Sequence, residues 1–331
     1  MEKSGIAGMR MAMFLWKGGA IMIYTLTLNP SLDYLVELES LKPGKINRAD
    51  SEELAFGGKG VNVSVMLKHL NVDSVALGFT AGVTAELYEH GVCSYGITPS
   101  FLRVKNGFTR INVKILDEEE TGVNGQGPQP DAQEVEQLLS LLDQLKDGDV
   151  LVMAGSVPKS VPDTIYAQMM RRVSDGVLCI VDTGGSAFLH VLEEGPFLIK
   201  PSIRELEEIF HCPMKEGVLL SSMHALQQRG VRNVLVSCGE KGAYLLDEHG
   251  GFYFGKSPAG RVINTTGAGD AMVAGFLKGW MQTNDYMLAF KRGIAAGSAT
   301  AFCKGMADAE SVKRLYAKVD IEIMREPVME G

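Results

Sequence analysis

Short apolar segments that alternate with longer amphipathic segments constrain this 331-residue chain more than any other feature. Residues 22–28 are β-branched and apolar and stop at Asn29-Pro30, which is typical of a buried strand that ends in a turn. Strands that alternate with helices indicate a mostly parallel sheet with helices on both faces. The other expected strands are 75–79, 150–153, 178–182, 197–200 and 233–237, and the expected helices are 60–70, 131–145, 162–173, 203–210, 222–229 and 271–281.

Two segments interrupt this alternation and predict a second, smaller sheet. Residues 33–56 and 101–115 carry alternating polar and apolar side chains without a helical period. Because they interrupt the first half of the α/β pattern, we expect a lid over the edge of the large sheet and a single domain over 22–331. In such folds ligands bind at the carboxyl ends of the strands, so the polar strand ends are the places to look for a site.

Composition excludes several classes of function. The net charge is −8, and no run of five or more Lys or Arg occurs, so nucleic acid is not an expected partner. The five cysteines are odd in number and form no Cys-x-x-Cys pair, which argues against a disulfide framework and against a zinc site. No window of 18 apolar residues predicts a membrane span.

The first residues differ from the rest. Residues 1–21 contain four methionines around a short apolar stretch and lack the long apolar run of a signal peptide. We expect an N-terminal extension outside the fold, with Met22 at the start of the folded chain and the protein in the cytoplasm.

The strongest motif covers residues 264–270, Asn-Thr-Thr-Gly-Ala-Gly-Asp, followed by the expected helix from Ala271. Glycines admit a ligand close to the backbone, and a helix start presents free N–H groups and the positive end of its dipole, which together form an anion cradle. Asp270 fits this place as a base beside a developing phosphoryl charge; an ordinary N-cap is the alternative that spacing leaves open. Two familiar nucleotide-binding patterns do not fit. Asp270 stands where the P-loop needs Lys, and Met272 stands where the dinucleotide pattern needs its third Gly.

A second motif, Gly-Gly-Lys-Gly-Val-Asn at 57–62, opens another expected helix. The glycine pair admits a ligand, Lys59 supplies a point charge for phosphate, and Asn62 offers a donor and an acceptor for hydroxyls. A flexible loop with an incidental lysine is the alternative.

These two motifs and three others occur in the order seen in the ribokinase-like (PfkB) carbohydrate kinases. The others are Asn-Pro-Ser-Leu-Asp at 29–33, Thr-Arg-Ile-Asn-Val-Lys at 109–114 and Ala-Gly-Ser-Val-Pro at 154–158. The chain resembles this family from Met22 to about Lys304, and most of all its branch of 1-phosphofructokinases and tagatose-6-phosphate kinases. The resemblance implies a three-layer α/β fold with a small β-sheet lid, ATP and Mg²⁺ as cofactors, and a phosphorylated ketose as substrate.

The resemblance also implies roles for single residues. Asp270 matches the general base, with the amides of Gly267, Ala268 and Gly269 as an anion hole, which favours the base over the N-cap. Asp33 matches the acid that binds sugar hydroxyls, and Lys59 and Arg110 resemble the cations that hold the phosphate already on the sugar. A solvated strand residue is the alternative for Arg110. The full substrate-binding set is Asp33, Gly58, Lys59, Asn62, Arg110, Asn112 and Ser156.

Nucleotide and metal contacts follow from weaker similarities. Residues 236–242 are similar to the family's turn at the ATP phosphates, and 296–298 resemble its adenine-side helix, although a tight turn and helix packing explain them equally well. Glu205 matches a residue that helps to hold magnesium through water, but Ser202 replaces the usual Asn of that motif, and residues 80–94 look irregular against the family pattern. The expected nucleotide-binding residues are Lys200, Ser237, Gly239, Gly242, Thr266 and Gly297.

The expected reaction is the phosphorylation of fructose 1-phosphate by magnesium-ATP to fructose 1,6-bisphosphate. Tagatose-6-phosphate kinase is the nearest alternative, and a non-catalytic phosphosugar sensor is the alternative from another class. Because an exposed lid sheet has unpaired edges, we also expect a homodimer through the lid.

Overall fold

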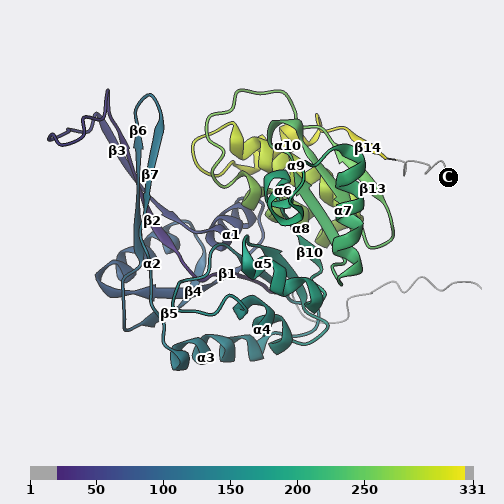
Figure 1. Ribbon diagram of the computed structural model, residues 1–331, viewed down its shortest axis with the longest axis horizontal. Helices are drawn as coiled ribbons and strands as arrows, with labels where there is room; N and C mark the ends of the chain where they lie inside the picture. The colour runs from purple at the N-terminus through teal and green to yellow at the C-terminus, as the bar shows by residue number, and fades with distance from the viewer. Residues whose placement is uncertain (1–20, 325–331) are drawn as a thin grey trace, which may run out of the picture.

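The computed structural model describes residues 21–324, so nearly all of the predicted N-terminal extension lies outside the described residues (Figure 1). Ten strands form the large sheet in the order β14-β13-β12-β11-β10-β9-β8-β1-β4-β5. Its parallel part runs from β11 to β5, and the last three strands along the chain add antiparallel at one edge. The strands are β1 Ile23–Thr27, β4 Val75–Ala81, β5 Thr98–Val104, β8 Val150–Ala154, β9 Leu178–Asp182, β10 Leu198–Ile199, β11 Asn233–Ser237, β12 Ala243–Leu246, β13 Phe252–Gly255 and β14 Ile321–Ile323.

Helices cover both faces of this sheet, as the alternating pattern predicted. One core cluster joins the sheet to α1, α8, α9 and α10, and the other joins it to α3 through α7. The central strands read as continuous apolar runs because both of their faces are buried, and every residue of β8 is buried. The helices are α1 Lys59–His69, α2 Ala85–Ser94, α3 Ala132–Leu141, α4 Ile165–Arg172, α5 Ser186–Val191, α6 Ile203–Phe210, α7 Glu216–Gln228, α8 Ala268–Thr283, α9 Tyr286–Ala301 and α10 Ala309–Tyr316.

A separate four-stranded sheet projects from the layered body and forms the lid (Figure 1). Its order is β3-β2-β6-β7, with β2 and β6 parallel in the middle. Strand β2 follows shortly after β1, and β3 leads directly into α1, so the lid is continuous with the body. The lid strands are β2 Ser31–Glu37, β3 Ser51–Gly57, β6 Arg110–Leu116 and β7 Glu120–Asn124.

The observed lid differs from the predicted one at two places. Residues 101–104 pair with β4 as the end of β5, so they belong to the large sheet, and the predicted lid segment 101–115 began too early. Strand β7 was not predicted; all of its residues are exposed, so it carries no alternation of buried and exposed positions.

The segment 80–94, which looked irregular in sequence, is regular. It contains the end of β4, a short 3₁₀ turn over Gly82–Thr84 and helix α2. Tyr88 of this helix is fully buried, and its hydroxyl donates to the Gly57 carbonyl over 2.8 Å. Helix α2 therefore supports the glycine pair at the base of the lid.

Helices α8 and α9 pack unusually close together. A Cβ atom on Gly275 would lie 2.7 Å from the Ala296 Cβ atom, and one on Gly279 would lie 2.6 Å from the Ala289 Cα atom. Glycine at these positions lets the two backbones approach each other, which fixes α8 and hence its N-terminus. No helix between residues 21 and 324 combines the length and the apolar character that a membrane crossing requires.

Candidate active site

Helix α8 begins at Ala268, three residues earlier than predicted, after the N-cap residue Gly267 with φ 80°. Asp270 is therefore in the first turn of the helix, and the N-cap alternative for it is wrong. Its side chain is buried, and its Oδ2 atom accepts a hydrogen bond from Asn62 Nδ2 over 2.8 Å. The two glycine-rich helix starts, which are 208 positions apart, thus meet at Asp270.

The surroundings of Asp270 make it a stronger base than an ordinary aspartate. Burial is the main cause that raises the pKa of Asp270 to about 6, and the nearby Asp182 carboxylate raises it further. Lys59, Asn62 and Lys200 act in the opposite direction. At neutral pH such a group is mainly ionised yet takes up a proton more readily than an exposed aspartate, which suits general-base catalysis.

Asp182, at the end of β9, lies between two lysines and was not predicted as a site residue. Lys59 Nζ donates to its Oδ1 atom over 2.9 Å, and Lys200 Nζ forms an ion pair with Oδ2 at 3.2 Å, without hydrogen-bond geometry. Burial alone would raise the pKa of Asp182, but Lys200 and Lys59 hold it below its usual value. The one signal in the sequence was its place at the polar end of an apolar strand.

Lys200 also lies against the predicted anion hole. A Cβ atom on Gly269 would lie 2.9 Å from Lys200 Nζ, so the absence of a side chain at this position lets the ammonium group approach the backbone. The Ala268 amide donates to the Thr265 carbonyl over 3.3 Å, a long bond that an anion could displace. Lys200 is therefore placed to add a full positive charge to the helix N-terminus.

Asp33, Asn112 and Arg110 meet at the base of the lid. Asp33 and Asn112 are register partners on β2 and β6, and Asn112 Nδ2 donates to Asp33 Oδ1 over 2.7 Å. Burial lowers the pKa of Arg110, whereas Asp33 raises it. The Arg110 Nε atom is buried and lacks a hydrogen-bond partner in residues 21–324, which does not fit a solvated strand residue. A Cβ atom on Gly57 would lie 2.4 Å from Asp33 Oδ2, so this group adjoins the Gly57-Gly58 pair.

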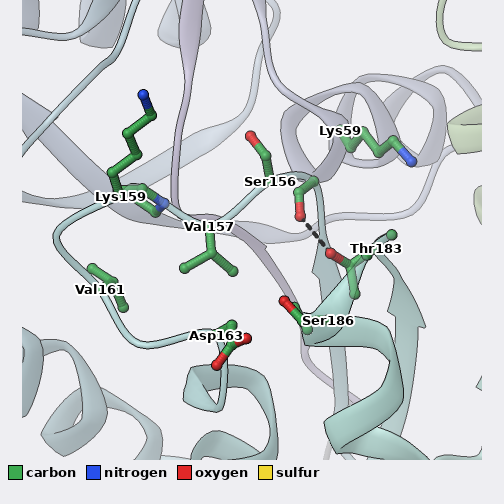
Figure 2. A pocket seen from close by; sticks show the side chains of 13 residues that line it. Lys59, Ser156, Val157, Lys159, Val161, Asp163, Thr183 and Ser186 are labelled. Atoms are coloured by element: carbon green, nitrogen blue, oxygen red, sulfur yellow. Dashed lines mark hydrogen bonds between the residues drawn. The ribbon is translucent and has the colours of Figure 1, made fainter.

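Lys59 and Ser156 line a cavity of about 600 Å³ next to these groups (Figure 2). It lies between the loop after β8 and the start of α5, where the Thr183 hydroxyl donates to the Gly155 carbonyl over 2.9 Å. Asp163 and Ser186 face its other end. Asp270 and Arg110 do not line this cavity, so Lys59 is the residue that connects it to the group around Asp270.

Several predicted nucleotide-binding residues also have packing roles. Gly242 has φ 117°, and a Cβ atom there would lie 2.0 Å from the Gly255 carbonyl oxygen. A Cβ atom on Gly297 would lie 3.0 Å from the Ala268 carbonyl oxygen, so Gly297 supports the anion loop from behind. Ser237 forms a β-bridge with Ser202, and Gly239 has φ 60° in the following turn. Packing alone therefore explains Gly242 and Gly297.

Ser202 and Glu205 form a capping box at the start of α6. Ser202 Oγ accepts from the Glu205 amide, and Glu205 Oε2 accepts from the Ser202 amide over 2.7 Å. The other carboxylate oxygen, Glu205 Oε1, takes no part in this capping box. It lies close to Gly184, since a Cβ atom there would be 3.3 Å from it. Among residues 21–324 no three acidic, His or Cys side chains form a metal-binding group. One carboxylate oxygen with water and phosphate oxygens matches how Mg²⁺ binds in kinase sites, so Glu205 fits the predicted role.

Comparison with known proteins identifies the family. Residues 26–313 match the pfkB family of carbohydrate kinases. The chain belongs to this family. It is a phosphotransferase with an alcohol group as acceptor, and the ribokinase-like fold with a mostly parallel sheet and a small lid is confirmed.

Three known proteins are similar to this chain over most of its length. The 1-phosphofructokinase of Bacillus subtilis is 38% identical over 91% of this chain and 99% of the relative. The D-tagatose-1-phosphate kinase of Bacillus licheniformis is 34% identical over 91% and 99% of the two chains. The solved structure of Escherichia coli phosphofructokinase-2 with substrates and products has a TM-score of 0.84 and 26% identity, and the match covers 90% of this chain and 99% of that one.

Proposed function

We propose that this pfkB-family enzyme transfers a phosphoryl group from ATP to fructose 1-phosphate and forms fructose 1,6-bisphosphate. The observation that carries the proposal is the placement of the buried Asp270 carboxylate, which lies at the glycine-lined start of α8 and contacts Asn62 of the second glycine motif. Lys59 belongs to that motif, and Arg110 lies beside Asp33, which adjoins Gly57 of the same motif. These two cations support a substrate that is already phosphorylated.

Each group has a definite role in the proposed mechanism. Asp33 and Asn112 of the lid hold sugar hydroxyls, and Lys59, Arg110 and Ser156 hold the phosphate on the sugar. Asp270 removes the proton of the acceptor hydroxyl as its oxygen attacks the terminal phosphorus of ATP. The amides of Gly267, Ala268 and Gly269, together with Lys200, stabilise the charge on the transferring group. Magnesium, held through Glu205, would neutralise the phosphate oxygens of ATP.

The names of the relatives favour a sugar that carries its phosphate on carbon 1. One relative is named 1-phosphofructokinase and the other D-tagatose-1-phosphate kinase. Fructose and tagatose differ only in the configuration at one carbon. The remaining alternatives are tagatose 1-phosphate and, with the phosphate at the other end, tagatose 6-phosphate. The raised pKa of Asp270 supports catalysis over a sensor that only binds.

A coupled assay of ADP release tests this proposal. It compares fructose 1-phosphate, tagatose 1-phosphate, fructose 6-phosphate, tagatose 6-phosphate and ribose with magnesium-ATP. We expect the highest kcat/KM with fructose 1-phosphate and little turnover of ribose, because an unphosphorylated sugar offers no phosphate for Lys59 and Arg110 to bind. A higher value with either 6-phosphate would overturn the assignment. Stabilisation against heat by the sugar phosphates without ADP release would instead support the sensor.

We further propose that the enzyme is a cytoplasmic homodimer whose two lids pack together. Side chains on one face of the lid form an apolar row across all four strands, because Tyr34 is the register partner of Leu54 and Val113, and Val113 of Val123. Leu54 is 41% exposed and Val123 is 61% exposed. An exposed apolar sheet face of this kind is typical of a protein interface.

A further inference from the structure

The polar face of the lid carries a cation to which the proposed mechanism assigns no role. Arg110, Asn112 and Lys114 alternate along β6, so their side chains lie on the same face of the lid sheet. Asn112 shows which face this is, because it contacts Asp33. Lys114 is therefore on the face that turns toward the active-site residues, one step further from the base of the lid than Asn112.

Lys114 reaches from the lid to the layered body. Its Nζ atom donates to Thr266 Oγ1 over 3.4 Å, a contact between residues 152 positions apart. Thr266 immediately precedes Gly267, the N-cap residue of α8. The ammonium group of Lys114, which comes from the lid, thus lies beside the same helix start at which Asp270 and Lys200 lie.

The charge of Lys114 is not neutralised by the protein. Within residues 21–324 the Thr266 hydroxyl is its one hydrogen-bond partner, and no carboxylate lies within ion-pair distance of it. The start of α8 already carries a positive partial charge from the helix dipole, and Lys200 adds another charge close by. The ammonium group of Lys114 adds positive charge beside this helix start, and such an arrangement favours the binding of an anion between these groups. Lys200 and Lys59, in contrast, share the Asp182 carboxylate.

We propose that Lys114 is a catalytic residue of the phosphoryl transfer and binds the terminal phosphate of a nucleoside triphosphate from the lid side. This inference rests on the proposed function and adds one residue to it. In the step itself the acceptor oxygen forms a bond to the terminal phosphorus, the bond from that phosphorus to the bridging oxygen breaks, and ADP leaves with the bonding electrons. The hydroxyl proton passes to Asp270, and Lys114 keeps its protons and contributes charge and hydrogen bonds.

The position of Lys114 on the lid gives this role a second consequence. The ammonium group can contact the transferring phosphate only while the lid is closed over the sugar. Phosphoryl transfer would therefore be assisted when the acceptor is bound, and transfer to water with the lid open would lack this assistance.

Substitution of Lys114 tests the proposal, with Lys42 as the matched control. Lys42 is an exposed lysine in the loop between β2 and β3 of the same lid. We expect Lys114→Met to lower kcat by about tenfold or more, within the range of lost charge-stabilising donors. The KM for fructose 1-phosphate should change by less than about threefold, since the group acts in the transition state. Lys114→Arg should restore part of the rate, and Lys42→Met should match the unaltered enzyme.

A binding experiment separates this proposal from the proposed function. The unaltered protein and Lys114→Met are each titrated twice. The first titration uses magnesium-ADP alone and measures binding in the ground state. The second uses magnesium-ADP with aluminium fluoride and fructose 1-phosphate, which mimics the transferring phosphate. We expect Lys114→Met to weaken only the second complex. A kcat near that of the unaltered enzyme, a rise in KM alone, or equal binding in both titrations would overturn the role of Lys114. If the unaltered protein phosphorylates none of the sugars, the proposed function fails. If it phosphorylates fructose 1-phosphate and Lys114→Met does so at the same rate, only the role of Lys114 fails.

Discussion

Asp270 lies at the proposed catalytic position, and its ionised form lowers the stability of the folded protein. Its folded-state pKa of about 6 lies above the ordinary value of 3.8, so folding favours the protonated form. The stability that protonated Asp270 contributes is fully present below pH 3.8 and is lost as the pH rises through about 6, where the buried carboxylate ionises. Above that pH the ionised group reduces the free energy of unfolding by about 3 kcal/mol, at 1.36 kcal/mol for each pKa unit.

We therefore predict that Asp270→Asn is more stable than the unaltered protein at pH 7 and nearly inactive. The gain in the free energy of unfolding should approach about 3 kcal/mol and should disappear on acidification toward pH 4. Denaturant unfolding at several pH values measures it. The loss of kcat should be about 10²-fold or greater with little change in KM, as for the removal of a general base. An enzyme with a near-normal rate would exclude Asp270 as the base.

The pH dependence of the unaltered enzyme follows from the same pKa. Since the base must be ionised, kcat/KM should fall as the pH drops through about 6. The profile of Asp270→Asn should lack this step in its residual activity. A profile that is flat between pH 5 and 7 would contradict the assignment.

Single residues also show where sequence reasoning stopped. The two glycine motifs predicted helix starts that bind anions, but nothing along the chain placed Asn62 beside Asp270, because that contact depends on how α1 and α8 pack. Asp182 was recognised only as the last residue of a strand. Its ion pairs with two lysines join side chains from three separate parts of the chain, and the spacing of apolar residues along the sequence does not predict such contacts.

At the scale of elements, close packing of α8 and α9 holds the start of α8 in place. A Cβ atom on Gly275 would lie 2.7 Å from both the Ala296 Cβ atom and the Arg292 carbonyl oxygen, and backbone cannot move away as a side chain can. A methyl group there must separate the two helices.

We predict that Gly275→Ala destabilises the protein by about 1–3 kcal/mol, the usual range for overpacking. Gly217 in α7 is the control, because nothing lies within 4 Å of a Cβ atom at that position. Gly217→Ala should stabilise by about 0.4–1 kcal/mol through the unfolded state. Thermal unfolding of both variants measures the difference. Equal effects at the two sites would mean that α8 and α9 can separate freely.

The elements of the large sheet were predictable because burial on both faces leaves continuous apolar runs, as in β8. The strands of the lid were less predictable. Phe101 and Leu102 continue an alternating pattern in sequence, yet they belong to β5, because pairing with β4 extends to Val104. Strand β7 pairs with β6 through its backbone and carries no buried side chain that would reveal it.

At the scale of the whole molecule, the apolar lid face determines the expected assembly. We predict that Leu54→Lys combined with Val123→Lys converts a dimer into a monomer of 35.8 kDa, because charge on this face opposes its burial. Light scattering at micromolar concentration measures the mass. Ile323→Lys, which replaces an apolar residue that is 71% exposed on β14, should leave the dimer intact. A monomeric unaltered protein would contradict the proposal.

The junction between the lid and the body has a consequence for how ligand affinities are related. Strand β3 ends at Gly57 and α1 begins at Lys59, so only Gly58 separates a rigid strand from a rigid helix. At this connection, tilting of the lid turns the backbone at Gly58 and is expected to displace the neighbouring Lys59, which shares the Asp182 carboxylate with Lys200. We therefore predict that the proposed sugar and nucleotide affinities depend on each other. A change made on the far side of the lid is expected to alter both together.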